Sequence, residues 1–251
     1  MKRILITGAS SGIGEATAFK AARDGWQVIA CGRNQAKLEE MRFKHPSIIP
    51  LAFDITDIEQ CRQALKGISA DVVLLNAGSC EYVDADDWDS ALFERVFRTN
   101  VFGVANCLEA LLPTMQAGSK LVFVDSLARL LPFTKSQAYG ASKAALFYMA
   151  KSLDVDLRDR GVHVQTISPG FVKTPLTDRN DFAMPMRIST DEAAGSIMRH
   201  IDRGTRTGYF PTAFAAILRV LSMLPMVLQI QICQRLKATS SSTDVTQAQD
   251  A

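Results

Sequence analysis

Apolar runs of a few residues alternate with longer amphipathic segments along most of the chain. The runs have the composition of strands buried on both faces of a parallel sheet, and they span residues 3–7, 26–34, 48–53, 71–75, 120–126 and 162–168. Helical periodicity marks residues 15–25, 35–44, 88–115, 139–153 and 190–203, and a further helix starts near residue 57. This alternation predicts an α/β chain: a doubly wound, mostly parallel sheet of six or seven strands with helices on both faces.

The pattern changes near the C-terminus. Residues 209–233 contain one charged side chain, Arg219, and two prolines divide them, which predicts two short apolar helices rather than a single membrane span. We expect residues 209–237 to line a substrate pocket or to contact another subunit, and an interfacial membrane anchor or a transmembrane helix are the alternatives. The polar residues 238–251 are predicted to be disordered.

Composition and charge fit one compact domain. The chain has 251 residues, of which 47% are hydrophobic, enough for a single large core. Its 28 basic and 26 acidic residues nearly balance, which argues against a nucleic-acid-binding surface. The five cysteines form no CxxC pair and the three histidines lack metal-ligand spacing, so we expect core thiols in a reducing compartment and no metal. The N-terminus enters a strand rather than a signal-peptide pattern, which predicts a cytoplasmic protein.

A glycine loop follows the first predicted strand. In TGASSGIG, Gly8 permits a tight turn, Gly12 lets the backbone approach a pyrophosphate, and Gly14 allows the next helix to pack closely on the sheet. The start of that helix would face the phosphates of a dinucleotide. The other candidate contacts in the loop are Ser10, Ser11 and Ile13, although serines here also serve turn geometry.

The end of the second predicted strand bears on the choice of cofactor. An NAD-binding chain usually places an acidic residue there, about 20 residues after the glycines, to bind the ribose hydroxyls. This chain has Gly32 and Arg33 instead. An arginine pairs with a ribose 2′-phosphate through charge-assisted hydrogen bonds, so the sequence favours NADP(H) over NAD(H). The alternative is that Arg33 is a solvated residue at the start of the next helix.

Three side chains further along carry acid–base chemistry. Tyr139 and Lys143 stand four positions apart in a helical pattern, so they share one helix face. An ammonium beside a phenol favours the phenolate, so we expect the pKa of Tyr139 to fall below its usual value of about 10. Tyr139 is therefore a candidate general acid and base. Ser126 follows a predicted strand and would point into the crevice where open α/β sheets bind ligands.

Taken together, the glycine loop, Ser126 and the YGASK segment resemble the classical short-chain dehydrogenase/reductase family over about residues 1–208. The resemblance implies a Rossmann-like dinucleotide-binding catalytic domain. It also implies roles for five further residues: Asp54 holding the adenine, Asn76 lining the adenine-ribose side, Asn100 holding a water that links Lys143 to solvent, and Val172 and Thr174 meeting the nicotinamide carboxamide and the pyrophosphate. Structural roles remain open for Asp54 as a turn or helix cap, for Asn76 as a support of the sheet, and for Asn100 as a mild helix weakener.

The resemblance further implies an NADP(H)-dependent oxidoreductase that reduces a carbonyl, or oxidises a secondary alcohol, on a hydrophobic small molecule. Ser126 would polarise the carbonyl oxygen, Tyr139 would protonate it, and Lys143 would tune Tyr139 and hold the nicotinamide ribose. Family members pair through their long helices, so we expect a homodimer or homotetramer. The alternatives are a non-catalytic NADP(H)-binding sensor and a membrane-associated scaffold that keeps the reductase fold.

Two features depart from the family pattern or lie outside it. Asp125 stands where relatives often have a second serine, and Arg129 stands where they often have glycine. We expect Arg129 to face water, with contact to an anionic substrate as the alternative. Residues 175–189 lack periodicity and suit a mobile loop over the site, with Phe182, Met184 and Met186 as adaptable apolar contacts.

Overall fold

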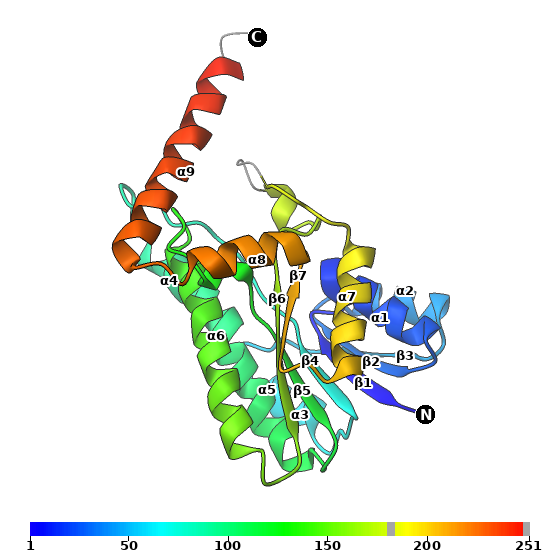
Figure 1. Ribbon diagram of the computed structural model, residues 1–251. Helices are drawn as coiled ribbons and strands as arrows, with labels where there is room; N and C mark the ends of the chain where they lie inside the picture. The colour runs from blue at the N-terminus through cyan, green and yellow to red at the C-terminus, as the bar shows by residue number, and fades with distance from the viewer. Residues whose placement is uncertain (180–183, 248–251) are drawn as a thin grey trace.

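The computed structural model describes residues 1–179 and 184–247, apart from the side chains of residue 179 and residues 238–247. Within that range the chain forms one parallel sheet of seven strands in the order β3-β2-β1-β4-β5-β6-β7 (Figure 1). The strands are β1 (Arg3–Thr7), β2 (Gln27–Gly32), β3 (Ile48–Ala52), β4 (Val72–Leu75), β5 (Lys120–Val124), β6 (His163–Pro169) and β7 (Thr207–Phe210). The predicted doubly wound α/β architecture is confirmed. The strand order reverses between β1 and β4, and crevices at such switch points bind ligands.

Successive residues of a strand face opposite sides of the sheet, and the core divides accordingly into two clusters. In β1, Ile4 and Ile6 belong to one cluster and Leu5 to the other. The first cluster is covered by α1 (Gly12–Arg23), α2 (Gln35–Lys44) and α7 (Thr190–Arg203). The second is covered by α3 (Ile58–Leu65), α5 (Gly103–Leu111) and α6 (Gln137–Asp156). Both faces of the sheet are therefore buried, which explains why the central strands β4 and β5 are apolar along almost their whole length.

The helical pattern over residues 88–115 is interrupted in the structure. Helix α4 (Ser90–Phe97) passes into a π-helical turn, η1 (Arg98–Phe102), before α5 begins. Asn100 lies in that turn and is fully buried. The local disturbance of the helix at Asn100 is thus present, and π-helical turns often occur at functional sites.

The C-terminal segment differs from its prediction in two places. Residues 207–210 form β7, a short edge strand beside β6 that the apolar pattern did not reveal. Two helices then follow, α8 (Thr212–Leu221) and α9 (Met226–Gln247), but α9 is 22 residues long rather than short, and it leaves the body of the molecule (Figure 1). Helix α9 continues through Gln247, whereas the sequence predicts disorder from residue 238. Across the described residues, no helix is both long and apolar enough to cross a bilayer.

Candidate active site

The glycine loop is held against the segment that follows the carboxyl end of β4, through Asn76 and the backbone of Ala77. Gly8 and Gly12 have φ angles of +67° and +55°, in the left-handed region that favours glycine. A Cβ on Gly14 would lie 2.1 Å from the carbonyl oxygen of Gly8, closer than any real contact. The Asn76 amide fixes the same turn, because its Nδ2 donates to the Thr7 carbonyl at 3.0 Å. These glycines leave open backbone at the N-terminus of α1, an arrangement that fits the phosphates of a dinucleotide.

Thr174 packs against this loop from the far end of the chain. A Cβ on Gly12 would lie 3.3 Å from Cγ2 of Thr174, so the two segments are in contact. The Thr174 hydroxyl accepts from the backbone N–H of Thr177, and Val172 is buried, with its carbonyl accepting from the Thr177 hydroxyl. The fold therefore brings the predicted Thr174 to the glycine loop, and Val172 lies buried two residues before it. Of the predicted apolar contacts in the loop over the site, Phe182 lies outside the described residues and Met186 is exposed.

The predicted cofactor-selecting residues gather at the carboxyl end of β2. The Ser10 hydroxyl lies 3.0 Å from where a Cβ of Gly32 would be, which brings the glycine loop and the end of β2 together. The Arg33 side chain is 79% exposed, and its Nη1 lies 3.8 Å from Oδ2 of Asp54. Asp54 also accepts hydrogen bonds from the backbone and hydroxyl of Thr56, so its turn-capping role is present in the structure. Ion pairs this exposed are weak, and Arg33 remains free to reorient toward an anion.

Ser126 and Tyr139 meet at the carboxyl end of β5. Ser126 is buried just beyond the strand, and its hydroxyl accepts from the backbone N–H of Ala128 at 3.1 Å. Tyr139 is half-buried on the first turn of α6. Burial raises the pKa of the Tyr139 phenol, and a hydrogen bond with Ser126 acts in the opposite direction. The predicted serine and tyrosine are therefore partners in the structure.

Lys143 lies one turn further along α6 and is buried. Its Nζ donates to the Val124 carbonyl at 3.0 Å and lies 5.7 Å from the centroid of the Tyr139 ring. Burial lowers the pKa of Lys143 to about 8, while the charge of Asp125 raises it. The expected lowering of the Tyr139 pKa is wrong for this geometry, because Lys143 Nζ bonds to a backbone carbonyl and the removal of the phenol from water dominates.

Asn100 joins the π-helical turn to the loop after β4. Its Nδ2 donates to the Ser79 carbonyl and to the Ser142 hydroxyl, both at 2.9 Å, and its Oδ1 accepts from the Ser79 backbone N–H at 2.7 Å. Gly78 sits between the two polar groups, since a Cβ there would lie 3.1 Å from Asn100 Oδ1 and 3.2 Å from Lys143 Nζ. The predicted Asn100 and Lys143 are therefore neighbours across this loop.

Two residues near the site were not predicted. Ser142 precedes Lys143 and is fully buried, and its hydroxyl donates to the Tyr139 carbonyl while accepting from Asn100. Its position next to Lys143 in the sequence was the available signal. Cys80 follows the loop after β4, and electrostatic interactions couple it to both Tyr139 and Lys143. Burial raises the pKa of the Cys80 thiol, so this side chain is an uncharged neighbour of Tyr139 and Lys143.

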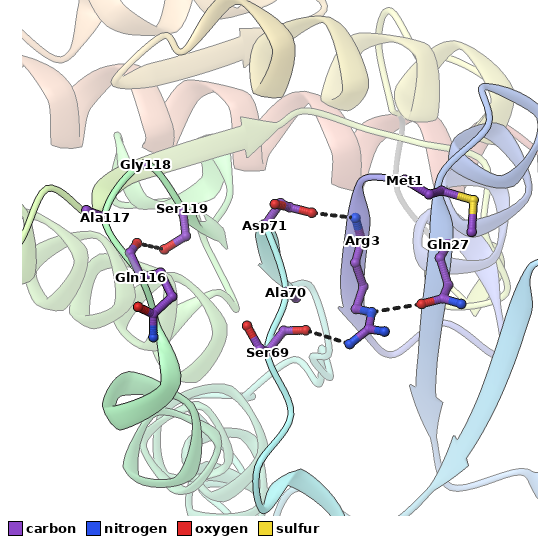
Figure 2. Close-up of a pocket in the computed structure, with 10 residues that line it drawn as sticks. All are labelled: Met1, Arg3, Gln27, Ser69, Ala70, Asp71, Gln116, Ala117, Gly118 and Ser119. Carbon is purple, nitrogen blue, oxygen red and sulfur yellow. Dashed lines mark hydrogen bonds between the residues drawn. The ribbon is translucent and has the colours of Figure 1, made fainter.

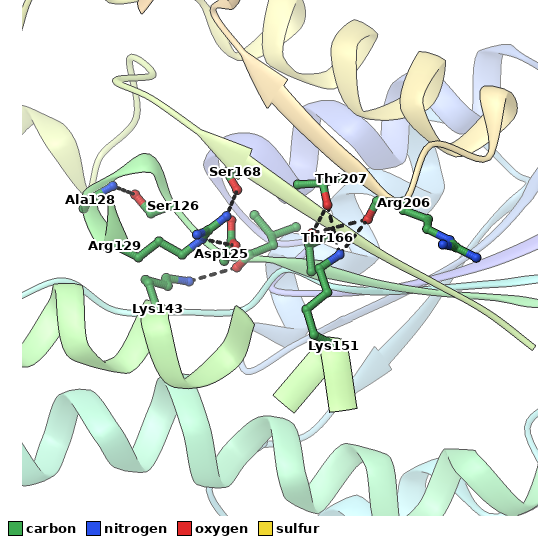
Figure 3. A network of polar contacts seen from close by, with 11 residues as sticks. Asp125, Ser126, Ala128, Arg129, Lys143, Lys151, Thr166, Ser168, Arg206 and Thr207 are labelled. Carbon is green, nitrogen blue, oxygen red and sulfur yellow. Dashed lines mark hydrogen bonds and ion pairs between the residues drawn. The ribbon is translucent and has the colours of Figure 1, made fainter. Parts of the chain in front are cut away.

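The prediction that Arg129 faces water is wrong. Its side chain is 8% exposed, and its Nε donates to Oδ2 of Asp125 at 2.7 Å (Figure 3). The guanidinium lies 3.5 Å from the centroid of the Phe147 ring and also reaches the Ser168 hydroxyl at 3.4 Å. Asp125 itself is buried, so each charge compensates the other. Asp125 and Arg129, the two residues that depart from the family pattern, therefore form one ion pair.

A separate surface cavity of about 560 Å³ lies at the opposite end of the sheet (Figure 2). The starts of β1 and β2 and the approaches to β4 and β5 line it, and its polar groups are bonded to one another, as when the backbone N–H of Arg3 donates to Asp71. Open α/β sheets bind ligands at the carboxyl ends of their strands, not here. Within the described residues, no cluster of side chains is arranged to hold a metal ion.

Comparison with known proteins agrees with this geometry. The family model described as short chain dehydrogenase matches residues 2–183. An uncharacterized oxidoreductase of Myxococcus xanthus (strain DK1622) is 35% identical over 244 residues, covering 93% of this chain and 96% of that protein. Serine 3-dehydrogenase of Rhizobium radiobacter is 35% identical over 187 residues, covering 69% of this chain and 73% of that protein.

A solved structure gives the same result. The crystal structure of a short chain dehydrogenase from Burkholderia cenocepacia J2315 in complex with NADP is 26% identical, with a TM-score of 0.72, and the match covers 83% of this chain and 94% of that one. The chain therefore belongs to the short-chain dehydrogenase family, a family of oxidoreductases, as its motifs predicted. The Rossmann-like single domain is confirmed with it.

We predict that Gly14→Ala destabilises the protein by about 1–3 kcal/mol, because the new methyl group overpacks the Gly8 carbonyl. Urea denaturation measures the change. Gly195→Ala in α7 is the matched control, since its Cβ would meet only the flexible end of Arg199, and it should leave stability unchanged or raise it by up to about 1 kcal/mol. Equal stability of the Gly14 variant and the native protein would contradict the close approach.

Proposed function

We propose that the protein is an NADP(H)-dependent reductase that converts a carbonyl group of a small apolar molecule to a secondary alcohol, or catalyses the reverse oxidation. The single observation that carries this is the meeting of Ser126, Tyr139 and Lys143 at the carboxyl end of β5. That end lies on the same edge of the sheet as the glycine loop after β1, with only β4 between them.

The nicotinamide dinucleotide, when bound, supplies or accepts the hydride, and this chain supplies orientation and proton transfer. The Ser126 hydroxyl donates to the carbonyl oxygen and polarises it. Tyr139, protonated because burial raises its pKa, transfers its proton to the same oxygen as negative charge develops. Lys143 holds the nicotinamide ribose and adds positive charge near Tyr139. Asn100 anchors the water chain that returns a proton to Lys143.

The remaining predicted residues hold the cofactor in this proposal. Ser10, Ser11 and Ile13 line the phosphates with the glycines, and Asn76 and Asp54 line the adenosine half. Val172, and Thr174 in contact with the glycine loop, meet the carboxamide and the pyrophosphate. Arg33 and Ser10 bind the 2′-phosphate, which favours NADP(H). The related Burkholderia cenocepacia protein, crystallised with NADP, supports that preference.

The substrate side of the site is apolar. Helix α8 packs Ala215 and Leu218 against Leu127 and Leu131, in the stretch that follows Ser126. Phe214 on the same helix meets Phe171 with ring centroids 5.7 Å apart. An apolar wall beside a polar reacting group selects a hydrophobic carbonyl compound with one polar end.

Tyr139→Phe tests the enzyme itself. We expect turnover of NADPH with a panel of apolar ketones and aldehydes, followed at the cofactor's absorbance band, and a loss of about a hundredfold or more in the variant, because the proton donor is removed. Tyr148→Phe, on the exposed face of α6, is the matched control and should keep full activity. Binding of NADPH with no turnover of any compound would favour the non-catalytic sensor instead.

Arg33→Ala tests cofactor choice. We expect the KM for NADPH to rise about tenfold or more and the KM for NADH to change little, because a charge-assisted hydrogen bond to the 2′-phosphate contributes about 1.5–3 kcal/mol. Arg42→Ala on α2 is the control, since Arg42 is exposed and pairs with Glu39 on its own helix. An unchanged ratio between the two cofactors in the Arg33 variant would refute the assignment.

We also propose that the outer face of α8 and α9 contacts an anionic lipid surface. Large apolar side chains are exposed along both helices and the turn between them: Ile217, Val220, Met223, Met226, Val227, Leu228 and Ile230. Residues 204–243 hold four basic and no acidic residues, so the charge of this segment complements anionic headgroups.

The proposed location is cytoplasmic and peripheral to a membrane, and all five cysteines are free, which suits a reducing compartment. In this proposal subunits pair through α5 and α6, and Tyr148 and Val155 are exposed on α6.

The test places charge on the exposed face without touching the core. Val220→Glu, Met223→Glu and Val227→Glu combined should abolish flotation with vesicles containing phosphatidylglycerol, while Phe43→Glu on α2 should leave it unchanged. The native protein should bind vesicles of phosphatidylcholine alone more weakly. Suppose instead that light scattering gives the triple variant half the molecular mass of the native protein, and that the native protein does not float with the vesicles. Then α8 and α9 form a subunit interface and the lipid proposal fails.

A further inference from the structure

The buried ion pair between Asp125 and Arg129 lies directly beside the reacting groups. Asp125 immediately precedes Ser126, and its backbone N–H donates to the Ile167 carbonyl, which extends the β5–β6 ladder by one bond. Arg129 ends the short turn η3 (Leu127–Arg129), whose N-cap is Ser126. The pair therefore closes the turn that begins at Ser126.

Three elements hold Arg129 in one place. Asp125 accepts from its Nε at 2.7 Å and Ser168 on β6 lies 3.4 Å from its Nη2 (Figure 3). The guanidinium also lies over the Phe147 ring of α6. A guanidinium fixed by a carboxylate and an aromatic face has lost its rotamer freedom. The turn that carries Ser126 is thereby tied to β6 and to α6, the helix of Tyr139 and Lys143.

The carboxylate also faces the buried ammonium of Lys143. Lys143 Nζ donates to the carbonyl of Val124, the residue before Asp125. Asp125 Oδ1 is buried and has no hydrogen-bond partner among the described residues, so one oxygen of the carboxylate is not committed to Arg129. The other titratable groups facing Lys143 are Tyr139 on its own helix and Cys80 after β4, and burial keeps both neutral near pH 7. Asp125 is therefore the anionic group that faces Lys143 among these residues.

We propose that the Asp125–Arg129 pair is a positioning element of the active site, which fixes the turn that carries Ser126 and provides the counter-charge that keeps Lys143 protonated. The proposal rests on the reductase function, in which Lys143 acts as a cation. Burial raises the pKa of the Asp125 carboxyl, the Arg129 guanidinium opposes that rise, and the charge of Asp125 in turn favours the Lys143 ammonium over the neutral amine.

The direct test is the titration of Lys143 in the protein without cofactor, followed by NMR of lysines labelled with ¹³C at Cε. Lys143→Arg assigns the resonance. We expect a midpoint of about 8 in the native protein, and a midpoint lower by about half a unit or more in Asp125→Asn, because the counter-charge is lost. Asp154→Asn, on the same helix and paired with Arg206, is the matched control and should leave the midpoint unchanged.

A second variant separates charge from folding. Asp125→Asn leaves Arg129 buried without its carboxylate and destabilises the protein, whereas Asp125→Asn combined with Arg129→Met removes both charges and should regain most of the lost stability. The lowered Lys143 midpoint should persist in the double variant. A double variant that is stable and titrates like the native protein would show a purely structural pair and overturn the proposal.

The pH dependence of kcat/KM is a second measurement, and it should shift in the same direction as the Lys143 midpoint. Carbonyl reduction requires a protonated Tyr139 and a cationic Lys143, so it is lost as pH rises through their pKa values. Removing Asp125 lowers both pKa values, and the basic limb of kcat/KM for the best compound of the carbonyl panel should move to lower pH by about half a unit or more. An unmoved basic limb in the stable double variant overturns the proposal. If no compound is turned over, the reductase function fails while the NMR titration still decides the role of the pair.

Discussion

The buried ammonium of Lys143 is the constraint on which the rest of the site depends. A lysine head taken out of water favours its neutral form, and burial lowers its pKa to about 8. The Val124 carbonyl at the end of β5 accepts a hydrogen bond from this ammonium, and Asp125 is the next residue of the chain. Gly78, which has no side chain, leaves room for the ammonium. The geometry of β5, the loop after β4 and the first turns of α6 follows from keeping this charge hydrogen-bonded inside the protein.

The same constraint explains the break in the long helix. In an uninterrupted α-helix over residues 88–115 the backbone groups would hydrogen-bond to one another, and no side-chain amide would be directed at the loop after β4. The π-helical turn at Arg98–Phe102 carries Asn100 to that loop, where its amide uses both donors and its acceptor on Ser79 and Ser142. Gly78 then packs against Asn100 and Lys143 together. The irregular turn is thus part of how the site is held.

Much of the fold could be predicted from the sequence, because it depends on local patterns. Helices α2 and α7 lie at residues 35–44 and 190–203, where periodicity and end signals put them, and six of the seven strands lie in the predicted runs. Strand β7 was missed because four residues at a sheet edge carry too little pattern. The clustering of Ser126, Tyr139, Lys143 and Asn100 was predicted from motifs. Arg129 and the pKa of Tyr139 were predicted wrongly, since burial and pairing depend on neighbours distant in sequence, such as Ser168 and Phe147.

The two faces of helix α8 have different surroundings, and because one helix carries both, a shift of the helix moves both faces. Its inner face closes the apolar wall beside Ser126, while its outer face lies open with Ile217 and Val220. In the proposed orientation on a bilayer, a molecule dissolved in the lipid would reach the reacting groups without first entering water. The concentration that matters to this enzyme would then be the substrate's concentration in the membrane, and sparing solubility in the aqueous phase would not limit its rate.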